Sequence, residues 1–184
     1  MDPESILNQC QQPTVVLLQA TFKSAEFLLS KALGGKWPYL SFRQLRGRKM
    51  DTKVQLIDEF IGALQLPLWV EDNWDWLHSS LWYMDSIPHD PFLFIIYDSQ
   101  EILLKEPDKD QFRVFLEILD SVGTSWNKGV PKLPEHKDEQ TYPVPFHVLF
   151  QCLPDHINSL RARFQATGVS FSEISFLEEE VYED

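Results

Sequence analysis

A run of six apolar residues, Phe92 to Tyr97 (FLFIIY), constrains the fold of this chain more than any other feature. A strand with one face in water alternates apolar and polar side chains, and this run does not alternate. Such a run is typical of a strand that is buried on both faces, as in a parallel sheet covered by helices. It therefore predicts an α/β protein.

The segments around this run alternate between strand and helix patterns. Strands are predicted at residues 14–20, 39–45, 144–153 and 169–176, and helices at residues 22–33, 51–64, 73–81, 110–122 and 154–166. Glycines and prolines between residues 123 and 143 predict a long loop. Because this is an α/β order without an internal repeat or a visible boundary, residues 1–184 are predicted to form a single domain.

The composition excludes several functions. The chain has 16 Lys and Arg against 28 Asp and Glu, a formal net charge of −12, which disfavours nucleic-acid binding and favours a cationic partner. Cys10 and Cys152 are too few for a disulfide scaffold or a Cys-rich zinc site. No apolar run reaches the roughly 18 residues of a membrane span, and the first residues do not resemble a signal peptide. We therefore expect a cytoplasmic protein that does not bind membranes.

Motifs for catalysis and for cofactors are missing. The sequence has no Gly-rich phosphate loop, no zinc-binding spacing of His and Cys, and no nucleophile elbow. Asp75 and His78 lie three residues apart and could form an acid–base pair on one helix face. Asp72 and Asp75 could in principle hold a divalent metal, but acids also favour the first turn of a helix for dipole reasons. We predict no cofactor, no metal and no catalytic residue.

Negative charge and tryptophan are concentrated in the middle of the chain. Residues 67–110 hold two basic and ten acidic residues, a net charge of −8, together with four of the six tryptophans. Charge runs are usually solvated surface. Here the carboxylates are interleaved with large aromatic side chains, which indicates a contact surface.

Residues 64–81 (LQLPLWVEDNWDWLHSSL), which overlap the start of this block, resemble the barstar family, the intracellular inhibitors of barnase-type ribonucleases. The shared pattern is a helix that ends in Leu-x-Leu-Pro, an aromatic loop, and Asn-x-Asp-x-Leu at the start of the next helix. The matching positions are Leu64, Leu66, Pro67, Trp69, Asn73, Asp75 and Leu77. The similarity extends over about residues 39–153, which leaves residues 1–38 and 154–184 as extensions that would lengthen the sheet or enlarge the interface.

The resemblance implies a three-layer α/β/α fold with a small parallel sheet and a binding protein without catalysis. It also implies that residues 69–79 enter a ribonuclease active site, where carboxylates replace phosphates and aromatic rings replace bases. The implied partner is a basic ribonuclease or toxin. The candidate contact residues are Trp69, Glu71, Asp72, Asn73, Asp75, Trp76, His78, Ser79 and Asp120, with Glu117 bordering the same surface.

The chain departs from the best-known family member, which has an acid at the position of Ser79 and an aromatic residue at that of His78. The phosphate-mimicking acid is therefore expected from Glu71 or Asp72, and a cationic toxin other than barnase is the expected target. Two other interpretations stay open. One is a non-inhibitory module that binds a basic protein, and the other is a small acidic hydrolase that uses Asp75 and His78.

Some candidate residues also fit structural roles. Asn73 is placed to cap the helix that follows it. Trp74 and Leu77 lie on the apolar stripe of that helix, which favours the core. Trp76 and Trp82 are six residues apart, so we do not expect both of them to be buried.

Overall fold

Five parallel strands form one sheet in the order β2-β3-β4-β1-β5. The computed structural model describes residues 13–35, 41–66, 73–82, 84, 91–129 and 143–176. The strands are β1 (Val15–Ala20), β2 (Ser41–Arg46), β3 (Phe92–Tyr97), β4 (Phe146–Cys152) and β5 (Phe171–Phe176). Strand β3 is buried at every position, as its continuous apolar sequence predicts.

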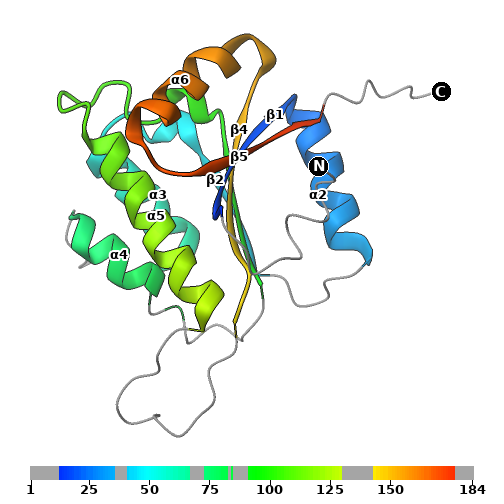
Figure 1. Ribbon diagram of the computed structural model, residues 1–184, viewed down its shortest axis with the longest axis horizontal. Coiled ribbons are helices and arrows are strands. Elements are labelled where there is room, and N and C mark those ends of the chain that lie inside the picture. Colours follow the sequence, from blue (N-terminus) through cyan, green and yellow to red (C-terminus); the bar gives the residue numbers. More distant parts are fainter. Residues whose placement is uncertain are drawn as a thin grey trace, which may run out of the picture.

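Helices cover both faces of this sheet (Figure 1). One face packs against α3 (Lys53–Leu64), α4 (Trp74–Trp82), α5 (Gln111–Lys128) and α6 (Ile157–Thr167), and the other packs against α2 (Phe22–Gly35). Successive side chains of β3 point to opposite faces of the sheet: Phe94 and Ile96 pack against the four-helix layer, and Leu93 and Ile95 pack on the side of α2. The expected three-layer α/β/α fold is confirmed.

The chain ends outside the barstar-like region add strands to the sheet. Strand β1 lies between β4 and β5, with Val15 opposite Val148 on one side and Phe171 on the other. The buried side chain of Gln151 ties three strand ends together, because it donates to Ala20 O at 2.7 Å and accepts from Asp98 N at 3.0 Å. The extensions therefore lengthen the sheet.

Helix α5 is longer than predicted. It continues to Lys128, so the prediction of a loop from residue 123 onward is wrong for its first six positions; residues 130–142 lie outside the described part. Gly123 is one of the glycines on which the prediction of that loop rests. The structure shows another reason for glycine, because a Cβ atom there would lie 2.1 Å from Thr14 Oγ1. The helix passes so close to the start of β1 that a side chain does not fit.

Two outward backbone groups of the edge strand β2 are capped by side chains. Arg43 donates through Nη1 to Phe42 O at 2.9 Å, and Arg46 N donates to Glu59 Oε1 at 3.0 Å. Glu59 also holds the Arg46 guanidinium in an ion pair. Because an exposed parallel edge is a template for unwanted strand pairing, these caps protect the edge.

Candidate functional site

Helix α4 is held against α5 along one side. Leu77 and Leu81 are fully buried in the core. Near the start of the helix, Trp74 Nε1 donates to Gln111 Oε1 at 2.6 Å. Near its end, Trp126 Nε1 donates to Leu81 O at 3.0 Å. Since these contacts lie at both ends, they fix the position and the rotation of α4.

Asn73 has the structural role of a helix cap. Its Oδ1 accepts a hydrogen bond from Trp76 N at 2.7 Å, and its backbone oxygen accepts from Leu77 N at 3.2 Å. The side chain thereby satisfies one of the free N–H groups of the first turn. Trp74 is half-buried and packs against the core, in agreement with its place on the apolar stripe.

The outer face of α4 presents a carboxylate next to an aromatic pair. Asp75 and Ser79 are exposed and lie one turn apart. His78 and Trp82 are half-buried, with ring centroids 5.5 Å apart and planes tilted by 37°. Trp76 is half-buried on the other flank, where it packs against the core. This face can therefore offer both a negative charge and ring surface to a partner.

Helix α5 adds further acids beside this face. His78 Nε2 lies 3.5 Å from Ser121 Oγ, and Glu117 is exposed one turn before Ser121 on the same side of α5. Arg113 forms ion pairs with Glu117 and with Asp110 at the start of the helix. The hydrogen bond from Arg113 holds the pKa of Asp110 below its ordinary value. Arg113 therefore lies between the carboxylates of Asp110 and Glu117 and orients both of them.

Not all predicted residues join this surface. Asp120 is half-buried and lies a quarter turn around α5 from Ser121. Trp69, Glu71 and Asp72 lie outside the described residues. Conversely, Asp110 and Ser121 were not among the candidates. The spacing of Asp110, Arg113 and Glu117 is a readable signal for ion pairing along a helix, whereas the contact between Ser121 and His78 depends on how two helices pack.

Two other uses of this surface, catalysis by Asp75 with His78 and metal binding by Asp72 with Asp75, can be compared with the described residues, which do not include Asp72. His78 faces Ser121, and no hydrogen bond joins it to Asp75 within the described ranges. No group of three or more His, Cys, Asp or Glu side chains in those ranges could hold a metal ion. Likewise, none of the helices seen in the structure is long and apolar enough to cross a membrane.

Comparison with known proteins identifies the family. The family model described as "Barstar (barnase inhibitor)" matches residues 40–151, which is more than half of the chain and contains β2, α3, α4, β3, α5 and β4. No curated protein matches the sequence. Among solved structures, the Aeropyrum pernix ORC2 protein in its ADP form is similar with a TM-score of 0.48 and 11% identity. That match covers 94% of this chain but 44% of the other, so the chain spans less than half of the archaeal protein. The chain belongs to the barstar family, a family of inhibitors and not of enzymes.

Proposed function

We propose that this protein inhibits a cationic ribonuclease by inserting the outer face of α4 and the loop before it into the active site. The observation that carries the proposal is the exposed Asp75 beside the His78–Trp82 ring pair, on a helix anchored at both ends. This helix lies within the region that matches the barstar family.

Electrostatics supports this use of the surface. A ribonuclease cleft binds a phosphodiester with Arg and Lys side chains, so carboxylates can occupy the same positions as phosphates. Asp75 supplies one from α4, and Asp110 and Glu117 supply two more from α5. Opposite fields on the two proteins also accelerate their encounter. The chain's net charge of −12 acts in the same direction.

The anchoring of α4 supports tight binding. A surface that is ordered before binding loses less conformational entropy when the partner arrives. The buried leucines and the two tryptophan hydrogen bonds hold the backbone of α4. The ring pair beside Asp75 then offers a stacking surface where a nucleobase of the RNA would lie.

The proposal extends to biological role and to the neighbouring loop. Trp69, Glu71 and Asp72 precede α4 in the sequence, and we propose that Glu71 or Asp72 supplies the acid that is missing at Ser79. The protein would act in the cytoplasm as the immunity partner of a basic toxin, with residues 1–184 forming one domain around the barstar-like region.

A ribonuclease titration tests the proposal. Barnase and other purified barnase-type ribonucleases are assayed on a fluorogenic RNA with increasing amounts of the protein and of Asp75→Lys, Asp72→Lys and the double variant. Because like charges in an interface cost several kcal/mol, each reversal should raise the inhibition constant by on the order of tenfold or more. Asp58→Lys is the matched control, since Asp58 is exposed on α3 and lies outside the proposed binding surface.

The outcomes separate the competing functions. Full inhibition by the double variant would show that α4 is not the inhibitory surface. If no ribonuclease is inhibited but the protein retains a basic protein in a salt-sensitive manner, it is a non-inhibitory binding module. Hydrolytic turnover that disappears in His78→Ala would overturn the assignment as an inhibitor.

A further inference from the structure

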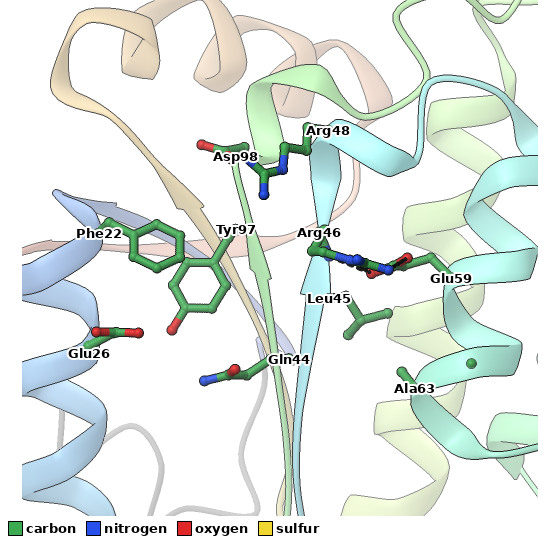
Figure 2. A pocket seen from close by; sticks show the side chains of 11 residues that line it. Phe22, Glu26, Gln44, Leu45, Arg46, Arg48, Glu59, Ala63, Tyr97 and Asp98 are labelled. Atoms are coloured by element: carbon green, nitrogen blue, oxygen red, sulfur yellow. Dashed lines mark hydrogen bonds and ion pairs between the residues drawn. The ribbon is translucent and has the colours of Figure 1, made fainter.

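A hollow of about 490 Å³ lies away from α4, at the β2 edge of the sheet (Figure 2). Its walls come from α2, from the carboxyl ends of β2 and β3, and from α3. The volume falls within the range of small-molecule pockets. None of the residues assigned above to the ribonuclease-binding surface lines it, so its occupation would be a separate property of the protein.

Tyr97, the last residue of β3, lines this hollow with an unsatisfied polar group. The residue is 4% exposed, and its hydroxyl is buried without a hydrogen bond to any residue that the structure describes. Its ring stacks on Phe22, with centroids 4.3 Å apart and planes at 29°. Figure 2 shows the hydroxyl pointing toward the space between Glu26 and Gln44. Since buried hydroxyls in native proteins nearly always have a partner, this one is arranged for a group that the described residues do not provide.

Two side chains beside this hydroxyl carry hydrogen-bond acceptors. Glu26 contributes a carboxylate from α2, and Gln44 contributes from β2 an amide that accepts through Oε1 and donates through Nε2. Both side chains are exposed and long enough to adjust toward a ligand. Burial and the nearby charge of Glu26 together raise the pKa of Tyr97 to about 12, so the hydroxyl stays protonated and neutral. This end of the hollow is therefore negative because of Glu26.

The lining carries both cationic and anionic side chains. Arg46 is held by both oxygens of Glu59, at 2.8 and 2.9 Å. Arg48 and Asp98 lie at the top of the hollow in Figure 2 and carry opposite charges. The lining thus contains two guanidinium groups and three carboxylates, an excess of one negative charge. Among the described residues, Glu59 is paired with Arg46, and no ion pair joins Glu26 to either guanidinium of the lining.

We propose that this hollow binds the ammonium group of a small primary amine. An ammonium has three N–H donors, and the site offers three acceptor groups, the Glu26 carboxylate, the Tyr97 hydroxyl and the Gln44 amide oxygen. Tyr97 accepts through its oxygen, and its own proton is free to point to Glu26. The rings of Phe22 and Tyr97 cover the alkyl part and attract the charge through their π-faces. A carboxylate or phosphate ligand would be repelled by Glu26.

The test uses butylamine as the probe, with butanol and butyrate as ligands of equal length that are neutral or negative. Amide and ring NMR signals of the isotope-labelled protein are followed at neutral pH during each titration. Butylamine should shift the signals of Tyr97, Glu26 and Gln44, whereas butanol and butyrate should leave them in place. Shifts spread over the acidic surface without preference for these three residues, or equal binding of butanol, would refute the proposal.

Three variants assign the binding to named atoms. Glu26→Gln should weaken butylamine binding by about tenfold, because a charge-assisted hydrogen bond is lost. Tyr97→Phe keeps the ring stack and removes only the hydroxyl, and should weaken binding severalfold. Asp58→Asn lowers the negative charge of the protein as much as Glu26→Gln does, at an exposed position outside the hollow. If Asp58→Asn weakens binding as much as Glu26→Gln, the attraction is general electrostatics and the site is wrong.

Discussion

Replacing Gly123 with Ala should destabilise the protein, although the same change normally stabilises a helix. Gly123 lies inside α5, where alanine is favoured over glycine by about 1 kcal/mol. A Cβ atom at this position would lie 2.1, 2.3 and 2.7 Å from Oγ1, Cγ2 and Cβ of Thr14. The sign of the effect therefore depends on whether the clash outweighs the helix preference.

The geometry indicates that the clash is larger. Ordinary contact begins at 3.4 Å, so Thr14 Oγ1 would have to retreat by about 1.3 Å. Thr14 is fully buried and β-branched, and its backbone oxygen accepts a hydrogen bond from Val148 N at 3.0 Å. Overpacking of this kind costs about 3 kcal/mol at the upper end of its usual range. After the helix preference is subtracted, we expect a net loss of about 2 kcal/mol, or roughly 4–8 °C in Tm.

Urea unfolding followed by tryptophan fluorescence and circular dichroism measures this loss. Gly62→Ala is the matched control, since Gly62 also lies inside a helix, α3, and a Cβ there meets nothing within 4 Å. That variant should gain about 0.5–1 kcal/mol. A Gly123→Ala protein as stable as the wild type would show that the helix and β1 separate without cost, and the packing argument would be wrong.

A double variant locates the clash. Thr14→Ala removes Oγ1 and Cγ2 but leaves the Cβ atom, which is still 2.7 Å from the new methyl group. We therefore expect Thr14→Ala to recover part of the loss caused by Gly123→Ala, with a coupling energy of about 1 kcal/mol in a double-mutant cycle. Strict additivity of the two changes would place the strain elsewhere.

Two further predictions concern Glu59 and Tyr97, which both line the hollow beside the β2 edge. Glu59→Gln removes the ion pair with Arg46 and should cost under about 1 kcal/mol, because Arg46 is exposed; weaker protection of the edge should also appear as concentration-dependent light scattering. Partial burial raises the pKa of Glu59, but its bonds with Arg46 outweigh this and lower it. The ionised Glu59 carboxylate therefore stabilises the fold above the ordinary carboxyl pKa, and this stabilisation is lost as the pH falls through the lowered pKa of Glu59. The Glu59→Gln variant should not show this loss of stability in its acid unfolding curve. Tyr97→Phe should leave neutral-pH stability unchanged or raise it by about 1 kcal/mol, since an unpartnered hydroxyl is removed. Because burial and Glu26 raise the folded pKa of Tyr97 from 10.0 to about 12, the wild type should lose stability between these pH values, and the variant should lose less.

The elements of the fold could be predicted because their signals are local. The run at residues 92–97 is apolar at every position, and β3 is buried at every position. The 3.6-residue period of α3 likewise places Leu56, Ile57, Phe60 and Ile61 in the core. The order of the strands could not be predicted in this way, because it depends on which strands pair with one another in the sheet. The apolar sequence of β1 is equally suited to several inner positions, and nothing in it indicates that it lies between β4 and β5.

Gly123 explains why the predicted C-terminal end of α5 is wrong. Glycine is a common stop signal, and this signal is local. Here glycine is needed because α5 crosses Thr14, a residue distant in sequence, at close range. Local sequence patterns do not indicate that α5 packs this closely against Thr14. The need for glycine at this tertiary contact therefore outweighs the usual association of glycine with helix ends.

Part of the candidate surface could also be predicted, because its signals are local in the sequence. The helix period separates the buried Leu77 and Leu81 from the exposed Asp75 and Ser79. Asn73 was recognised as a cap because its position before the helix is a local feature. The contribution of Ser121 and the exact place of Asp120 depend on how α5 is rotated, which only packing determines.

The C-terminal extension also bears on the proposed inhibitory surface, through α5. Phe115 of α5 stacks with Trp74 of α4, and Phe112 of the same helix packs edge-on against Phe164 of α6. Arg163 of α6 adds a hydrogen bond to Ile102 O at 2.7 Å and lies over the Phe112 ring. Helix α5 is thus held from two sides, and α4 is positioned on a support that α6 helps to fix. Because ordering before binding reduces the entropic cost of association, the proposed inhibition would be strengthened by α6 through its support of α5.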